Sequence, residues 1–122
     1  MGFVAGETCS VALALDQRAI DLVHLARTTL GDSSLEAEML EAFDFRATML
    51  VLRMQQAARS GIRAAAHALN GSARSIGAWL AAEAVKFAAE SGTEPELRSA
   101  VNQLGIVVKE TCAAIAEFLP RN

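Results

Sequence analysis

The sequence predicts an all-α protein, an up-and-down four-helix bundle with an additional helix at its N-terminus. Three observations support this prediction. Alanine, the strongest helix former, fills 25 of the 122 positions. The two prolines stand at positions 95 and 120, so neither interrupts a helix before residue 94. Short breaks rich in Gly and Ser divide the chain into five helical stretches, and connections this short make successive helices antiparallel.

Capping signals indicate where the first two helices begin and end. Asp16 is expected to cap the first helix, which runs to about Leu30. Ser33 and Glu36 have the spacing of a capping box, in which each side chain accepts a hydrogen bond from the other residue's backbone. They are expected to open a long second helix that ends near Arg59, before the Ser-Gly break.

The remaining three helices follow from the same signals. The third is expected over 61–76 and the fourth over 78–90, because a glycine separates them. Thr93 and Glu96 repeat the capping-box spacing, and the proline between them stands in the first turn, where its missing N–H costs little. The fifth helix then runs to about residue 119.

Length and charge limit the function classes. We expect one domain over 13–120, preceded by a loosely ordered segment over 1–12, because 122 residues suffice for one core. The formal net charge is −3, which argues against a nucleic-acid partner or an anionic membrane surface. No uncharged apolar run approaches the roughly 18–20 residues of a membrane span.

The N-terminal stretch and the cysteines predict a cytoplasmic protein. The apolar stretch over 3–15 contains Glu7 and has no Lys or Arg before it, so it is a poor signal peptide. Cys9 and Cys112 lie near opposite ends of the chain, and we expect a reduced pair that behaves as small hydrophobic residues.

The second helix is apolar on two faces. With roughly 100° per residue, one face is the expected core stripe: Met39, Leu40, Phe43, Ala47, Leu50, Val51 and Met54. Phe45, Met49 and Leu52 fall on the opposite face and are called the outer stripe below. The outer stripe is expected either to be covered by the N-terminal segment or first helix, or to dock a partner.

The third helix carries an exposed histidine. Its core side is expected to consist of Ile62, Ala65, Leu69, Ala73 and Ile76, and His67 lies nearly opposite them. Within about 60° of His67 on the helix surface lie Arg63, Asn70, Gly71 and Arg74. A glycine within a helix costs about 0.8–1 kcal/mol relative to alanine. Gly71 therefore indicates either close helix packing or room for a bulky group to approach the histidine.

An exposed imidazole beside guanidinium groups suits phosphoryl chemistry. The neutral ring offers a nucleophilic nitrogen, and arginine can hold a phosphoryl group by charge-assisted hydrogen bonds. The chain has no Gly-rich loop with Lys and Ser or Thr that would cradle a nucleotide. Such a protein can accept and donate a phosphoryl group but is not an autonomous kinase. The alternative is a solvated surface histidine with no role.

The residues around this histidine resemble a known family signature. Positions 66–78 read Ala-His-Ala-Leu-Asn-Gly-Ser-Ala-Arg-Ser-Ile-Gly-Ala. This run resembles the signature of histidine-containing phosphotransfer (HPt) domains: Ala-His-x-Leu-Lys-Gly-Ser-Ala, two variable residues, an aliphatic residue, then Gly-Ala. The order and lengths of the expected helices are also similar to the family over nearly the whole chain, including a central Phe, here Phe43, in the long second helix.

The resemblance implies a phosphorelay intermediate. His67 would take a phosphoryl group on its distal ring nitrogen from the aspartyl phosphate of a receiver domain and pass it to another receiver. The receiver would bring the Mg²⁺, so no cofactor is expected on this chain, and a hybrid sensor kinase would be a further partner. The family docks receivers through its second and third helices, which favours docking for the outer stripe. The sequence leaves the oligomeric state open, and we favour a monomer.

Position 70 departs from the family pattern. The family has Lys three residues after the histidine, where this chain has Asn70, which donates hydrogen bonds but adds no charge. Either Arg63 or Arg74 takes over the electrostatic part, or transfer is slowed or restricted to one partner. A third reading is a non-phosphorylated helical module that docks or sequesters receiver domains, or dimerises.

Other chemistry-bearing residues are expected to be structural. His24 lies among apolar neighbours, Trp79 covers the start of the fourth helix, and Cys112 packs in the core without an activating neighbour. Two histidines with no cysteine nearby are a poor ligand set, so no metal site is expected. The acidic residues of the second helix are expected to form a solvated face: Glu36, Glu38, Glu41 and Asp44.

Overall fold

The computed structural model describes residues 19–119, which form five helices packed against each other and contain no strand. The helices are α2 (Leu22–Thr29), α3 (Ser33–Gln56), α4 (Arg59–Ser75), α5 (Trp79–Ala89) and α6 (Glu94–Phe118). The all-α prediction is therefore confirmed. The expected segment 1–12, Cys9 and the cap at Asp16 lie outside the described residues.

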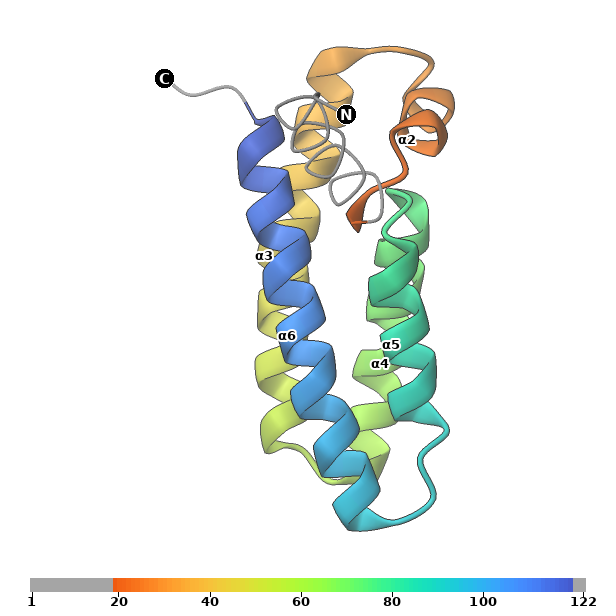
Figure 1. Ribbon diagram of the computed structural model, residues 1–122, viewed down its shortest axis with the longest axis vertical. Coiled ribbons are helices and arrows are strands. Elements are labelled where there is room, and N and C mark those ends of the chain that lie inside the picture. The colour runs from red at the N-terminus through yellow and green to blue at the C-terminus, as the bar shows by residue number, and fades with distance from the viewer. Residues whose placement is uncertain (1–18, 120–122) are drawn as a thin grey trace, which may run out of the picture.

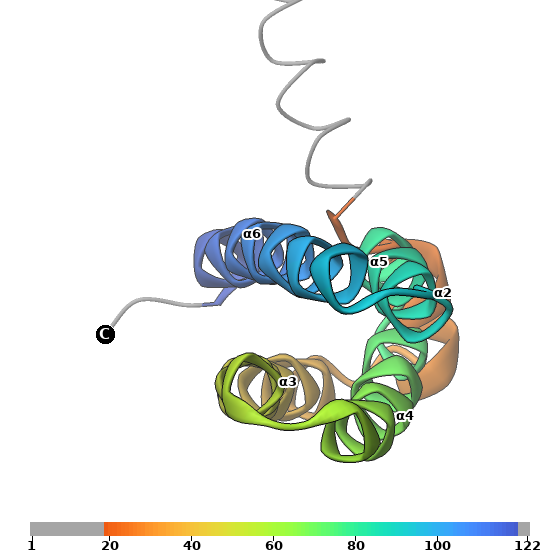
Figure 2. The same cartoon turned by 90° about the horizontal axis from the view of Figure 1, so that it is seen from below.

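Four of the helices run side by side, and the short α2 lies at one end of them (Figure 1). Seen along their axes, α3 is next to α4, α4 next to α5, α5 next to α6, and α6 next to α3 (Figure 2). Each of the four helices thus has two neighbours and one outward face. Any site on an outward face is open to a partner.

The core lies between these four helices and is rich in alanine. The largest fully buried side chains include Met54 of α3, Leu69 of α4 and Leu104 of α6. Between the larger side chains stand buried alanines of α3, α4 and α5: Ala47, Ala65, Ala66, Ala73, Ala81, Ala82 and Ala88. Because alanine adds little bulk, α4 and α5 can approach closely, and the larger polar side chains remain outside.

The first described helix begins later than predicted. A helix running from Asp16 to Leu30 was expected, but the chain leaves helical geometry at Asp21, where φ is −80° and ψ is 99°, and α2 starts at Leu22. The Asp21 carboxylate caps α2 by accepting a hydrogen bond from the backbone N–H of His24 at 3.1 Å. The Asp21 N–H donates to the carbonyl of Gly77 at 2.8 Å instead of to its own helix.

The cap of α3 is Asp32, not Ser33. The Asp32 carboxylate accepts from the backbone N–H of Leu35 at 3.1 Å, and Ser33 is already the first helical residue. The expected Ser33–Glu36 capping box is therefore wrong. Glu36 instead accepts a hydrogen bond from the hydroxyl of Thr29 at 3.3 Å, which ties α3 to α2. Asp and Ser are comparable caps, and here the residue one position earlier takes the role.

The break between α3 and α4 also lies earlier than predicted. The chain turns at Ala57, whose ψ is 159°, whereas Ser60 and Gly61 lie inside the first turn of α4. A Cβ added at Gly61 would lie 3.0 Å from that of Ala57, so the glycine allows a tight turn instead of ending a helix. Arg98 of α6 covers the end of α3 by donating to the carbonyl of Gln55 at 2.7 Å.

The start of α6 is as predicted. The Thr93 hydroxyl accepts from the N–H of Glu96 at 3.2 Å, and the Glu96 carboxylate accepts from the N–H of Thr93 at 3.3 Å. This reciprocal pair is a capping box with Pro95 in the first turn. It fixes the turn that brings α6 back along α5 and α3.

Candidate functional site

His67 lies in the middle of α4 and is exposed. The opposite face of this helix is buried as predicted, including Ile62, Leu69 and Ala73. The helical period alone therefore turns the imidazole toward solvent. A burial requirement of the core does not explain this histidine.

His67 lines a hollow between α4 and α5, which we call the His67 hollow. Its volume is about 390 Å³ and it is open to solvent. The helix α4 and the helix α5 each contribute one wall, and the residues that line it are Arg63, Ala66, His67, Asn70, Arg74, Val85, Lys86 and Ala89. All three polar residues predicted around His67, which are Arg63, Asn70 and Arg74, thus line the same hollow.

The charge of the His67 hollow has one sign. Arg63, Arg74 and Lys86 line it, and no carboxylate does. Among residues 19–119 the one salt bridge joins Arg59 and Glu94, with 3.9 Å between Nε and Oε2, so none of these three cations is part of an ion pair. Three cations around one hollow repel each other unless an anion lies between them. The hollow is therefore suited to bind an anion.

Asn70 is held in place by Arg74. The Nε–H of Arg74 donates to the Oδ1 of Asn70 at 3.2 Å. This bond uses the acceptor end of the amide and leaves its NH₂ group, together with the terminal guanidinium nitrogens of Arg74, as donors. Both residues can then present N–H groups to an anion in the His67 hollow.

Gly71 is not explained by packing within residues 19–119. It is exposed, and a Cβ built on it would meet no atom within 4 Å. Close helix packing, one of the two readings of this glycine, is therefore excluded among the described residues. The helix surface one turn after His67 is left bare and accessible.

The glycine at the end of α4 has a different environment. Gly77 has φ of +78°, and a Cβ added there would lie 2.9 Å from both the Cβ and the carbonyl oxygen of Asp21. Asp21 also accepts a hydrogen bond from the indole N–H of Trp79 at 2.9 Å. We call these three residues, Asp21, Gly77 and Trp79, the Asp21 junction. It joins the start of α2 to the turn between α4 and α5.

The environment of Asp21 favours its charged form. The Trp79 indole N–H, and next the backbone N–H of His24, lower the pKa of the Asp21 carboxyl below its ordinary value. His24 packs edge-on against Trp79, with 4.9 Å between ring centroids. His24 and Trp79 therefore stabilise the contact between α2 and α5, in agreement with their predicted structural roles.

The outer stripe is exposed but does not reach the His67 hollow. Phe45, Met49 and Leu52 expose 73%, 46% and 48% of their surface, so among the described residues no helix covers them. None of the three lines the His67 hollow. Leu52 instead lines a separate groove between α3 and α6, together with Cys112.

Burial, with a smaller contribution from Asp44, raises the pKa of the Cys112 thiol to about 11, so this thiol stays protonated at neutral pH.

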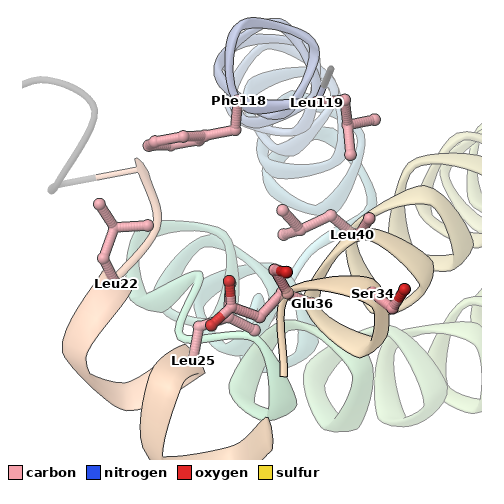
Figure 3. A pocket seen from close by; sticks show the side chains of 9 residues that line it. Leu22, Leu25, Ser34, Glu36, Leu40, Phe118 and Leu119 are labelled. Carbon is pink, nitrogen blue, oxygen red and sulfur yellow. The ribbon is translucent and has the colours of Figure 1, made fainter. Parts of the chain in front are cut away.

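Another hollow lies at the α2 end of the molecule, where side chains of α2, α3 and the end of α6 surround it (Figure 3). Its volume is about 420 Å³, and its lining is mostly apolar, with Leu22, Leu40 and Phe118. Glu36 is the one ionisable residue among the described residues that line it. The described residues that line it include no Lys, Arg or His, in contrast to the His67 hollow.

Residues 19–119 contain neither a cluster of metal ligands nor a membrane-spanning helix. No three His, Cys, Asp or Glu side chains in this part of the chain come together as a metal-binding group. No helix in it has both the length and the apolar character that crossing a membrane requires.

Lys86 also lines the His67 hollow, although the sequence pattern does not place it near His67. The helical phase of α5 places it on one strip with Trp79 and Glu83, but that phase does not say which neighbour the strip faces. Only the packing of α5 against α4 brings the Lys86 side chain to the His67 hollow.

Comparison with known proteins found no match: no family model, no curated protein and no solved structure matches the chain.

Proposed function

We propose that this chain is a histidine phosphotransfer protein with an HPt-like fold, an up-and-down four-helix bundle preceded by an additional helix. The observation that best supports the proposal is the exposed ring of His67 beside three cations and no carboxylate. A surface histidine without a role needs no such surroundings. An acceptor of an anionic phosphoryl group does.

In the proposed reaction the ring nitrogen of His67 attacks the phosphorus of a receiver's aspartyl phosphate. An N–P bond forms, the P–O bond to the aspartate breaks, and its electron pair stays with the aspartate carboxylate. The reverse sequence on another receiver returns the phosphoryl group to an aspartate. Phosphoryl transfer depends mainly on positioning and on stabilising charge spread over the phosphoryl oxygens.

The residues around His67 have separate parts in this proposal. Arg63 and the terminal nitrogens of Arg74 attract the phosphoryl oxygens, and Asn70 donates from its amide. Gly71 leaves the helix surface bare, so that the active site of a receiver can come close to the ring. The receiver supplies the Mg²⁺ in this proposal, so the reaction needs neither a metal site nor an ATP site on this chain.

The partners in this proposal are response-regulator receiver domains and a hybrid sensor kinase, in the cytoplasm. Neither a nucleic acid nor a membrane takes part, and the chain acts as a monomer. The outer stripe of α3 is the proposed docking surface. Because none of its residues lines the His67 hollow, a receiver that uses it must extend from α3 across α4 to reach the ring.

A second candidate function is favoured by the exposure of the outer stripe. A non-phosphorylated binding module would dock or sequester receiver domains, or dimerise, through Phe45, Met49 and Leu52 without using His67. Receiver binding or self-association would then be weakened by Met49→Asp and unchanged by His67→Ala. Analytical ultracentrifugation and titration with receiver domains measure both effects.

The test of phosphotransfer uses the receiver domains of the source organism, each charged with acetyl [³²P]phosphate. We expect at least one to pass its label to the chain as an acid-labile, alkali-stable phosphoramidate. His67→Gln should abolish the label, and His24→Gln, which changes the other histidine of the chain, should retain it. The proposal is overturned if the label survives His67→Gln, or if no receiver transfers its label to the chain.

A further inference from the structure

Lys86 approaches His67 from a different helix than the other cations. Arg63 and Arg74 belong to α4, the same helix as the ring, whereas Lys86 lines the His67 hollow from α5. A phosphoryl group on the ring nitrogen has three oxygens that point in different directions. Side chains on α4 lie on the ring's own side of the hollow, and a donor on α5 lies on the other wall.

The Lys86 ammonium has no acidic partner among the residues that the structure describes. Glu83 and Glu90 lie three residues before and four residues after it on the same helical side, which is the spacing of helix ion pairs. Within residues 19–119, however, no carboxylate is within salt-bridge distance of Lys86. An ammonium group carries three hydrogen-bond donors on a flexible side chain. It can therefore move toward a phosphoryl group when that group is added and away when it is removed.

The α4 side of the hollow leaves a position where a further cation could contact a phosphoryl group. Arg74 already uses its Nε–H on Asn70 at 3.2 Å. Asn70 lines the His67 hollow as an uncharged donor. The positive charge on the α4 wall of the hollow therefore comes from Arg63 and Arg74, and the position between these two, Asn70, has no charge.

We propose that the Lys86 ammonium of α5 holds the phosphoryl oxygens on His67 from the wall of the hollow that faces α4. This inference rests on the proposed phosphotransfer function and names a residue of the same site. The positive charge around the phosphohistidine is thus divided between two helices.

The test uses potassium phosphoramidate as the phosphoryl donor, so that no receiver is needed. The ring nitrogen of His67 forms the bond to phosphorus, the P–N bond of phosphoramidate breaks, and ammonia leaves. Phosphorus NMR follows the rate of labelling and the half-life of the label. We expect Lys86→Gln to lower the labelling rate about three- to fivefold, as for the loss of one charge-assisted contact at an open site.

Matched variants separate a local contact from a change of net charge. Lys109→Gln removes the one other lysine of the chain, which lies on α6 outside the His67 hollow, and it should leave the rate unchanged. Asn70→Lys in the Lys86→Gln background returns an ammonium to the hollow from α4, and it should restore the rate. A merely structural role of Lys86 predicts no such rescue.

The outcomes distinguish this inference from the function on which it rests. Equal rates for Lys86→Gln and Lys109→Gln, with His67 labelled, overturn the role of Lys86 alone. An effect of Lys86 together with no transfer from any receiver overturns the relay and supports the phosphoryl contact. No label on His67 in the unaltered chain overturns both.

Discussion

Gly71 and Gly77 belong to one motif at nearly adjacent turns of the chain, yet their surroundings are opposite. Gly77 has a positive φ, and its missing Cβ makes room for the backbone and side chain of Asp21 at 2.9 Å. Gly71 lies within a regular helix, and a Cβ there would meet nothing within 4 Å. The fold requires a glycine at position 77, whereas it would be more stable with another residue in place of Gly71.

This difference teaches how to read a motif. A residue that the fold needs says little about function, because any protein with the same turn would need it. A residue that costs helix stability and relieves no contact among the described residues is not explained by the packing of residues 19–119. Gly71 therefore supports partner docking beside His67 more strongly than Gly77 does.

Gly77→Ala should cause the largest loss of stability. A non-glycine residue at positive φ costs about 1–2 kcal/mol, and the overlap with Asp21 adds to it, so we expect a loss of about 2–4 kcal/mol. Chemical denaturation followed by circular dichroism measures it. Gly31→Ala is the matched control, because Gly31 has φ of +80° but no atom within 4 Å of its added Cβ. Equal losses for the two variants would mean that Asp21 exerts no steric demand.

Asp21→Asn should have a smaller effect that depends on pH. The folded state lowers the pKa of Asp21, so the charged carboxylate stabilises the fold above the ordinary Asp pKa, and this contribution is lost as pH falls through the folded value. Asn keeps the cap and removes the charge. We expect a lower melting temperature than the unaltered chain at pH 7 and a difference that shrinks as the pH falls below the ordinary pKa of Asp. A difference that is constant with pH would mean that the charge of Asp21 is unimportant.

Gly71→Ala should change stability least and in the opposite direction. Replacement of an exposed glycine within a helix adds about 0.5–1 kcal/mol to the free energy of unfolding. In the proposed function the same methyl group hinders a receiver, so transfer from a receiver should slow while labelling by phosphoramidate stays unchanged. A stabilised variant with normal transfer would show that the bare surface at Gly71 has no part in docking.

Much of the fold was predictable because its determinants are local. Alanine content and the Thr93–Glu96 capping box act within a few residues, and the long helices follow from them. The interruption at Asp21 was not predictable in this way. It depends on a backbone hydrogen bond to Gly77 and on the Trp79 indole, both of which lie far away along the chain.

The candidate site divides in the same manner. The strip of Arg63, His67, Asn70 and Arg74 follows from the period of one helix, and the structure brings all four to one hollow. Lys86 lies on another helix, and its place depends on how α5 is rotated against α4. That rotation depends on how the buried side chains of α4 and α5 pack against each other, and the sequence pattern of each helix leaves it open.

The Asp21 junction also has a practical consequence for optical work. Trp79 is the one tryptophan of the chain, and the chain has no tyrosine. Its ultraviolet fluorescence therefore comes from a single indole, the one that donates to Asp21 and packs against His24. Without any attached dye, the emission of this protein reports whether α2 remains seated on the end of α5.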